Sequence, residues 1–133
     1  MPLPTSLPAD LAASFARRVA ERDVVRPPEP PSQTPEAIAQ RLAHWLETTH
    51  HVRDYRARAA FAQLLLHLLA HPEAPTAALT SAAGLGPRMT ARHLLRLAEW
   101  GLAEWFYRGR TRYHRLTRSG EDALLPVVTG AGA

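Results

Sequence analysis

The fold is decided by the stretch Gly84-Leu-Gly-Pro-Arg-Met-Thr-Ala-Arg-His-Leu-Leu-Arg-Leu-Ala-Glu-Trp-Gly-Leu102. Its two leading glycines have the conformational freedom that a tight turn requires. Pro87 suits the first position of a helix, where a backbone N–H has no partner within the helix. Gly101 stands where a helix commonly ends on a left-handed residue. Because Thr76 is expected to cap a short helix over Ala77–Ala83, the sequence predicts two helices joined by a glycine turn, which is a helix-turn-helix.

The second helix of this pair has an apolar face and a basic face. The residues of the apolar face are small or aliphatic: Thr90, Ala91, Leu94, Leu97 and Ala98. Three arginines recur every four residues on another face: Arg88, Arg92 and Arg96. In a helix-turn-helix the second helix enters the major groove of DNA. The pattern therefore predicts a recognition helix with outward-facing arginines.

The residues after this helix predict a β-hairpin and a further helix. Ala103–Arg108 is aromatic and extended in pattern, Gly109-Arg-Thr111 is a turn sequence, and Arg112–Leu116 returns as a second strand. Thr117 or Ser119 then caps the next helix. Helix, turn, helix, hairpin and helix in this order predict a winged helix-turn-helix, which is mainly α (α+β) with a two-stranded wing.

Two motifs resemble those of ArsR-type and MarR-type bacterial transcriptional regulators. Ala91-Arg-His-Leu-x-x-Leu-x-x-x-Gly-Leu102 resembles the end of their recognition helix. Tyr113-x-x-Leu-Thr-x-x-Gly120 resembles the passage from their second wing strand into the next helix. The resemblance covers roughly residues 55–125 and implies a DNA-binding regulator. The chain departs from these families because it lacks the paired-cysteine metal sites of many ArsR proteins and the long C-terminal dimerisation helix of MarR proteins.

The positive charge is concentrated in the predicted recognition helix and wing. Residues 88–118 hold eight arginines against two glutamates, a net charge of +6. The rest of the chain holds eight arginines against ten acidic residues, a net charge of −2. A basic surface on one side is typical of proteins that bind a polyanion. The charge distribution therefore favours a nucleic-acid partner over a merely solvated surface.

The individual arginines of the recognition helix receive different predicted roles. Arg88 and Arg92 lie in its N-terminal half and are expected to reach base edges, where the guanidinium fork matches O6 and N7 of guanine. Arg96 is expected to contact a phosphate. Met89 and Ala91 are candidates for contact with thymine methyl groups. The position of His93 leaves two roles open, packing or a phosphate contact.

The wing is expected to hold the DNA backbone or an adjacent minor groove. The candidate residues surround the hairpin tip: Arg108, Arg110 and Arg112. The alternative is a charged edge strand that only deters aggregation. The aromatic residues Trp105, Phe106 and Tyr107 are expected to pack on the recognition helix, and the alternative is that they stack on single-stranded bases.

Upstream of the helix-turn-helix the sequence predicts two helices with a break at Thr48–Val52. The first begins at Thr34-Pro-Glu36, with a cap, a proline at the first position and an acid in the first turn. The second runs over about Arg53–Ala70 and is ended by Pro72. Its core candidates recur at helical spacing: Tyr55, Ala59, Ala62, Leu65, Leu66 and Leu69.

The N-terminal region is predicted to be a separate helical arm. Asp10 can cap a helix to about Asp23, on which Leu11, Phe15 and Val19 form a narrow apolar stripe. Such a helix is not stable alone, so it is expected to pack on the body or on a second subunit. The expected organisation is an arm (1–25), a proline-rich linker (26–34), an accessory or dimerisation helix (35–52), a winged-helix DNA-binding domain (53–126) and a C-terminal tail (127–133). Regular secondary structure is expected to weaken from Leu125 onward, before the tail begins.

Several functional classes are excluded by composition or motif. Apolar runs do not reach the roughly 18 residues of a membrane span, and the N-terminus lacks a secretory pattern. Cysteine is absent, which excludes disulfides and fits a reducing cytoplasm. Common catalytic signatures such as Gly-x-Ser-x-Gly and His-Glu-x-x-His are missing, so we expect no enzyme activity. We therefore expect a cytoplasmic, nucleoid-associated protein.

The histidines do not predict a metal site. His67 and His71 have a spacing that can hold a metal, but no acid at a fixed spacing completes a site. We expect no metal and no cofactor. A small-molecule effector stays open, because apolar helices can line a pocket, although no convergent polar group marks one.

The sequence as a whole predicts sequence-specific binding of double-stranded DNA by a homodimeric transcriptional regulator, paired through its N-terminal helices. One alternative is a DNA-architecture, repair or replication protein that uses the same winged helix without sequence preference. The other is a protein-interaction winged helix, which Leu95 and Trp100 keep open because both side chains are expected to be exposed.

Overall fold

The computed structural model describes residues 11–23 and 30–131, and the chain divides into two units, Met1–Pro30 and Pro31–Ala133. The first unit contains helix α1 (Leu11–Asp23), as predicted, with the side chains of Leu11 and Phe15 exposed. The proposed cap Asp10 and residues 26–29 of the proline-rich linker lie outside the described residues. Among the described helices, none combines the length and apolar character needed to cross a bilayer.

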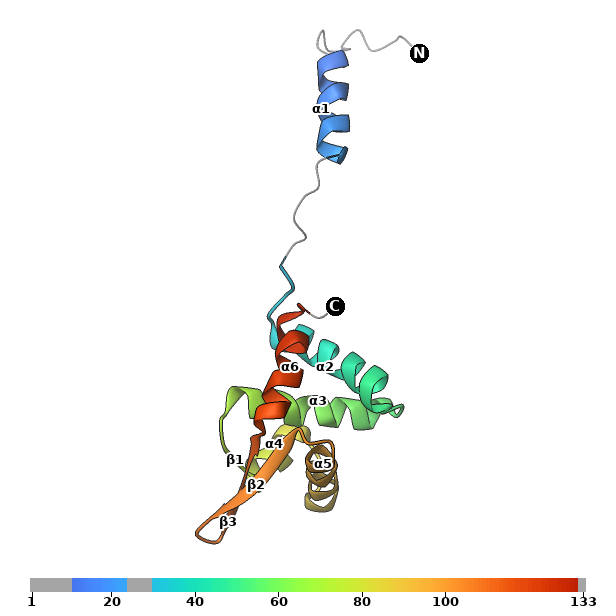
Figure 1. The fold of residues 1–133 in the computed structure, drawn as a ribbon. Helices are drawn as coiled ribbons and strands as arrows, with labels where there is room; N and C mark the ends of the chain where they lie inside the picture. Colours follow the sequence, from blue (N-terminus) through green and yellow to red (C-terminus); the bar gives the residue numbers. More distant parts are fainter. Residues whose placement is uncertain (1–10, 24–29, 132–133) are drawn as a thin grey trace. The chain divides into compact units, whose positions relative to one another are not determined.

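The second unit is a mainly helical winged helix-turn-helix, as predicted (Figure 1). Its elements are α2 (Pro35–His50), α3 (Tyr55–Ala70), β1 (Ala74–Pro75), α4 (Thr76–Ala83), α5 (Pro87–Glu99), β2 (Ala103–Arg108), β3 (Thr111–Leu116) and α6 (Arg118–Thr129). Helices α2 and α6 pack together at one end of the unit, and α5 and the β2–β3 hairpin lie at the other end.

The predicted break between α2 and α3 is made without glycine. Helix α2 begins as predicted, with the Thr34 hydroxyl accepting the N–H of Ala37. It ends at His51, which has a left-handed φ of 57°, and the N–H of Val52 donates to the carbonyl of Leu46. Arg58 then donates to the carbonyl of Val52 and so ties this connection to α3.

The core surrounds α3. Its central leucines (Leu64, Leu65 and Leu68) pack with buried leucines of the helices around it, namely Leu42, Leu46, Leu79, Leu94, Leu97 and Leu124. The predicted core face of α3 was wrong at two positions, because Tyr55 is 66% exposed and Ala59 is also exposed. Ala60 and Phe61 are buried instead. Ala60 and Phe61 are buried because α3 packs against both α2 and α4, which makes its buried face wider than one stripe, whereas Tyr55, the first residue of the helix, and Ala59 lie outside that face.

A two-residue strand that the sequence did not predict completes the sheet. Strand β1 pairs antiparallel with β3, in register Ala74↔His114, and the strand order is β1-β3-β2. The strand also corrects the start of α4. Pro75 takes the extended N-cap conformation, and Thr76 is the first helical residue instead of the cap. The hydroxyl of Thr76 lies 2.8 Å from Nε2 of His114.

The prediction that the chain is weakly structured from Leu125 onward was wrong, since α6 continues through Pro126 to Thr129. Arg41 on α2 stabilises this last turn, because its guanidinium donates to the carbonyls of Val127 and Val128 at 3.0 and 2.6 Å. Carbonyls of a last turn have no partner within the helix, so the arginine supplies the missing donors. The C-terminal region is thus fixed from a distant helix.

Close backbone packing joins the end of α5 to the start of α6. The side chain of Thr117 caps α6 by accepting the N–H of Gly120 at 2.8 Å. The hydroxyls of Thr117 and Ser119 both donate to the carbonyl of Gly101, which has the predicted left-handed conformation (φ 74°). A Cβ atom at Gly120 would overlap the carbonyl oxygen of Leu102. Position 120 therefore requires glycine because of contact, not because of its dihedral angles.

Candidate nucleic-acid interface

Helix α5 has one buried and one exposed side, as predicted for a recognition helix. Gly84 ends α4 in a left-handed conformation (φ 64°), and Pro87 starts α5. Four side chains of α5 are buried against the core: Thr90, His93, Leu94 and Leu97. The residues proposed to touch DNA are all exposed: Arg88, Met89, Ala91, Arg92 and Arg96. The predicted apolar face included Ala91, which the structure assigns to the exposed side.

Two buried polar residues fix the orientation of α5. The hydroxyl of Thr90 donates to the carbonyl of Gly86 at 3.0 Å. His93 is 7% exposed, its ring packs on Phe61 with 4.3 Å between centroids, and its Nδ1 lies 2.8 Å from the carbonyl of Met89. Because a carbonyl only accepts, Nδ1 is the protonated nitrogen and donates to Met89. Of the two roles left open for His93, the structure supports packing.

The exposed arginines of α5 are largely unpaired. Within the described residues, Arg88 and Arg92 form neither an ion pair nor a hydrogen bond through their side chains. Arg96 lies 3.9 Å from Glu99 one turn further on, and both side chains are more than half exposed. An exposed ion pair of this length contributes little, so it does not hinder contact with a phosphate.

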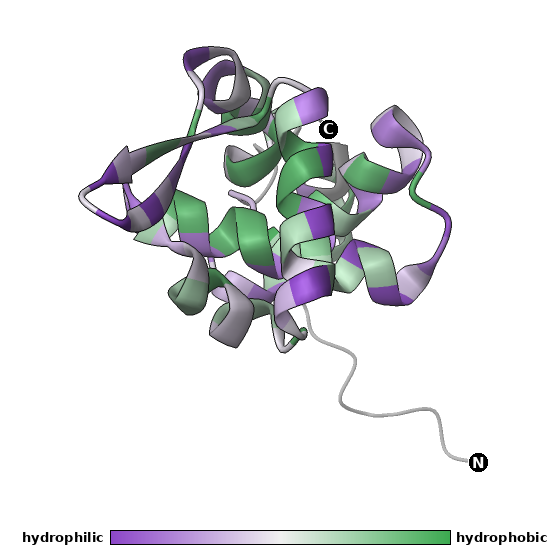
Figure 2. Cartoon of the chain, turned by 90° about the horizontal axis from the view of Figure 1, so that it is seen from below, coloured by the Kyte–Doolittle hydropathy of each residue, from purple (hydrophilic) through white to green (hydrophobic). Residues whose placement is uncertain are grey.

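The wing is a β-hairpin with a two-residue turn. Gly109 has a left-handed φ of 65°, and Arg108 pairs with Thr111 across the turn, so Arg110 stands at the tip. Strand β3 begins at Thr111, which was predicted to belong to the turn, so the strand starts one residue earlier than predicted. Figure 2 views this end of the chain and shows hydrophilic residues at the hairpin tip. Hydrophobic residues colour the helices in the middle of the view.

The three wing arginines have different surroundings. Arg110 is exposed and forms no side-chain ion pair with any described residue. Arg108 pairs with Glu73 at 2.9 Å, which ties the wing to the segment before β1. Arg112 has no carboxylate partner among the described residues, and its guanidinium donates to the hydroxyl of Tyr107 at 2.7 Å. Arg110 and Arg112 are therefore the wing cations with charge left for a phosphate.

The wing aromatics contact arginines of the hairpin itself. Arg112 lies over the rings of Trp105 and Tyr107, each 5.3 Å from the ring centroid. Phe106 stacks on Tyr113, with 5.9 Å between centroids. Trp105 is 41% exposed and Tyr107 is 60% exposed. The expected packing of these rings on the recognition helix is thus not their principal contact.

A buried histidine links the wing to the helix-turn-helix. His114 on β3 is only 3% exposed. Its burial, and secondly the positive charge of Arg112, lower its pKa from 6.5 to about 4. The imidazole is therefore neutral near pH 7 and shares a hydrogen bond with the Thr76 hydroxyl at the start of α4. This bond fixes β3 against α4.

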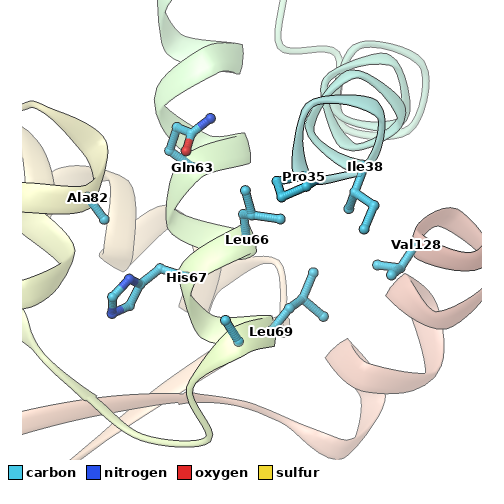
Figure 3. A pocket seen from close by; sticks show the side chains of 9 residues that line it. Pro35, Ile38, Gln63, Leu66, His67, Leu69, Ala82 and Val128 are labelled. Carbon is cyan, nitrogen blue, oxygen red and sulfur yellow. The ribbon is translucent and has the colours of Figure 1, made fainter. Parts of the chain in front are cut away.

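An apolar groove of about 510 Å³ lies away from this interface, among α2, α3, α4 and α6. Figure 3 shows Ile38, Leu66 and Val128 gathered at this groove from three different helices. His67 also lines the groove, and its ring lies 4.3 Å from that of His71. Among the described residues, no cluster of three or more potential metal ligands occurs.

The solved structures that this chain resembles include two proteins of 21% and 22% sequence identity. A MarR family transcriptional regulator from Silicibacter pomeroyi DSS aligns with a TM-score of 0.58 and 21% identity, over 98% of this chain and 77% of that chain. The Mycobacterium tuberculosis protein RV1404 aligns with a TM-score of 0.53 and 22% identity, over 92% of this chain and 73% of that chain. No protein-family model and no curated protein matches the sequence. The chain thus has a winged helix-turn-helix fold similar to that of a MarR family transcriptional regulator.

Proposed function

We propose that this protein binds double-stranded DNA in a sequence-specific manner and regulates transcription. The observation that carries the proposal concerns Arg88 and Arg92 on the exposed side of α5. Among the described residues, neither side chain has an ion-pair or hydrogen-bond partner, so both charges are available to DNA. The wing, with Arg110 at its tip, lies at the same end of the unit (Figure 1). The similar structure from Silicibacter pomeroyi DSS is described as a transcriptional regulator, which supports the same function here.

In the proposed complex α5 lies in the major groove. Arg88 and Arg92 bind guanine edges, and Met89 and Ala91 contact thymine methyl groups. Arg96 is closer to the end of the helix and binds a phosphate. The wing arginines Arg108, Arg110 and Arg112 bind the backbone or the adjacent minor groove, with Arg108 remaining paired to Glu73.

We further propose a homodimer that pairs through the helices before Arg53. The exposed Leu11 and Phe15 of α1 give this region apolar surface that a second copy can cover. In this organisation residues 1–25 are the arm, 26–34 the linker, 35–52 the accessory helix and 53–126 the DNA-binding domain. Two recognition helices then read a DNA site with approximate two-fold symmetry. The protein would act in the cytoplasm, on the nucleoid.

Fluorescence anisotropy tests the proposal. The full chain is titrated onto a labelled duplex from the region upstream of its own gene, and onto a random duplex, at two salt concentrations. We expect tighter binding to the upstream duplex and a steep loss of affinity with salt, because arginines release condensed counterions. Arg56→Ala removes an exposed arginine of α3 that lies outside the interface, so it is the control for loss of positive charge. This variant is expected to bind both duplexes as the wild type does. Equal affinity for both duplexes would contradict sequence-specific regulation.

A further inference from the structure

The β2–β3 hairpin has two faces that differ in what their side chains contact. Residues paired across an antiparallel ladder share a face. One face, called here the inner face, consists of Ala103, Trp105, Tyr107, Arg112, His114 and Leu116. Near the body its residues are buried, as Ala103 and His114 show. Towards the tip the same face continues beyond the helices, and the side chains of Trp105 and Tyr107 become exposed.

The opposite face of the hairpin is satisfied by its own contacts. Glu104 accepts a hydrogen bond from Arg115 at 2.8 Å. Phe106 stacks on Tyr113, and Arg108 lies over both rings while pairing with Glu73. Each charge and each ring on this face thus has a partner within the described chain. The rings of this face are therefore occupied by partners from the same chain, and Arg108 is left with the backbone contact proposed above.

The exposed part of the inner face is built differently. Its cation, Arg112, lies over Trp105 and Tyr107 and donates two hydrogen bonds to the Tyr107 hydroxyl, at 2.7 and 3.1 Å. No carboxylate of the described residues neutralises it. Trp105 and Tyr107 are two residues apart on β2, so their side chains are about 7 Å apart along the strand. The result is two adjacent aromatic rings held in place by an arginine that keeps its charge.

We propose that Trp105, Tyr107 and Arg112 form a stacking platform for unpaired nucleobases of DNA. Aromatic rings at this spacing suit successive bases of an unstacked strand, and every base presents a π-face. The guanidinium of Arg112 binds the phosphate between them. In an intact duplex the base faces are covered by neighbouring bases, so the platform engages only where DNA is locally opened. This inference rests on the proposed DNA binding, to which it adds a second kind of DNA as ligand.

The test compares three DNAs: an intact duplex, the same duplex with a four-nucleotide mismatched bubble, and a single strand of the same length. Wild-type protein is expected to bind the bubble about tenfold more tightly than the intact duplex. Trp105→Ala is expected to remove that preference and to leave affinity for the intact duplex unchanged, because loss of one stacking ring costs about tenfold. Trp105→Phe keeps a stacking ring and is expected to retain most of the preference.

Tryptophan fluorescence gives a second readout of the platform, in which the wild type is compared with a variant that keeps an aromatic ring at position 105. Bubble DNA is expected to quench tryptophan emission of the wild type, and much less that of the Trp105→Phe variant, because Trp45 and Trp100 are half-buried and both rings pack on His50, outside the hairpin. Phe106→Leu on the opposite face is the matched control for the affinity test. It is expected to keep the preference for the bubble.

The outcomes separate this inference from the proposed function. If the wild type binds intact duplex but prefers neither bubble nor single strand, the platform is disproved and the proposed function stands. If Trp105→Ala lowers the affinity for intact duplex and for bubble DNA equally, Trp105 either supports the hairpin or contacts duplex DNA. That result would again disprove the platform. If no DNA is bound, both proposals fail.

Discussion

At the scale of single residues, Arg92 and Arg110 are the most informative pair. Both are exposed and neither forms an ion pair with a described residue, but one lies on α5 and the other at the wing tip. An arginine on a recognition helix faces base edges, whereas one at a wing tip faces the backbone or a narrow minor groove. Equal charges are therefore expected to have unequal effects on binding.

We expect Arg92→Ala to weaken binding to the specific duplex by about tenfold or more and to change binding to random duplex little, because it removes a base contact. Arg110→Ala is expected to lower the affinity for both duplexes alike. It should also reduce the slope of log affinity against log salt concentration by about one. Anisotropy titrations over a salt series measure both effects. An equal loss on specific and random DNA for Arg92→Ala would argue against base recognition.

His114 predicts a pH dependence of stability. Its pKa is about 4 in the folded chain and about 6.5 when unfolded, so between these values the unfolded state binds more protons. The free energy of unfolding should thus fall as pH decreases from 6.5 to 4, by up to about 3 kcal/mol, and be constant above pH 7 as far as this residue is concerned. Urea unfolding of wild type and His114→Gln measures the difference. A His114→Gln variant with an unchanged pH profile would exclude His114 as the cause.

Residue-level expectations succeeded where a helix period alone determined exposure. Arg88, Arg92 and Arg96 are exposed because they lie opposite Leu94 and Leu97 on one regular helix. The partner of Arg108 was not foreseen, because Glu73 is distant in sequence and only the fold brings it close. For the same reason periodicity alone left the role of His93 open, and contact with Phe61 on another helix was needed to decide it.

At the scale of elements, helix α6 depends on α2. Its last turn contains Pro126, which cannot donate a backbone hydrogen bond, yet the helix continues to Thr129. The carbonyls of Val127 and Val128 receive their hydrogen bonds from Arg41. The sequence did not reveal this length, because its stabilising donor lies on a helix near the start of the unit. Strand β1 escaped prediction similarly, since two residues with a proline carry no strand pattern of their own.

We expect Arg41→Met to lower the free energy of unfolding by about 2 kcal/mol, because two partly buried carbonyls lose charged donors while the aliphatic stem is largely retained. Urea denaturation at pH 7 measures the change. The control is Arg56→Met, an exposed arginine of α3 that donates only to the neighbouring Tyr55 hydroxyl. Similar small losses in both variants would contradict the role assigned to Arg41.

At the scale of the whole molecule, the chain consists of a compact winged unit and a separate N-terminal unit. The winged unit was predicted, because the motifs of the winged helix occur in their proper order. The bounds of the arm (1–25) and of the Pro-rich linker (26–34) stay predictions. Sequence periodicity also revealed the stripe on α1. It does not reveal what covers that stripe, because an apolar face is compatible with any apolar partner.

Deletion of residues 1–30 is expected to convert the proposed dimer to a monomer and to weaken binding to a two-fold symmetric duplex at least tenfold, since both half-sites no longer bind as one unit. The melting temperature of the remaining unit should change little. Sedimentation velocity gives the oligomeric state, and Phe15→Ser in the full chain tests the stripe without truncation. A truncated chain that remains dimeric would place the contact elsewhere.

The junction of α5 and α6 has a consequence for motion. Gly101 accepts hydrogen bonds from two hydroxyls of the following segment, and Gly120 leaves no space between its Cα and the Leu102 carbonyl. Helix α6 in turn is held by Arg41 of α2. These contacts join α5, through α6, to α2 at the opposite end of the unit. We therefore expect a displacement of α2 to move α6 and α5 together, so that α5 does not rotate independently of the rest of the unit.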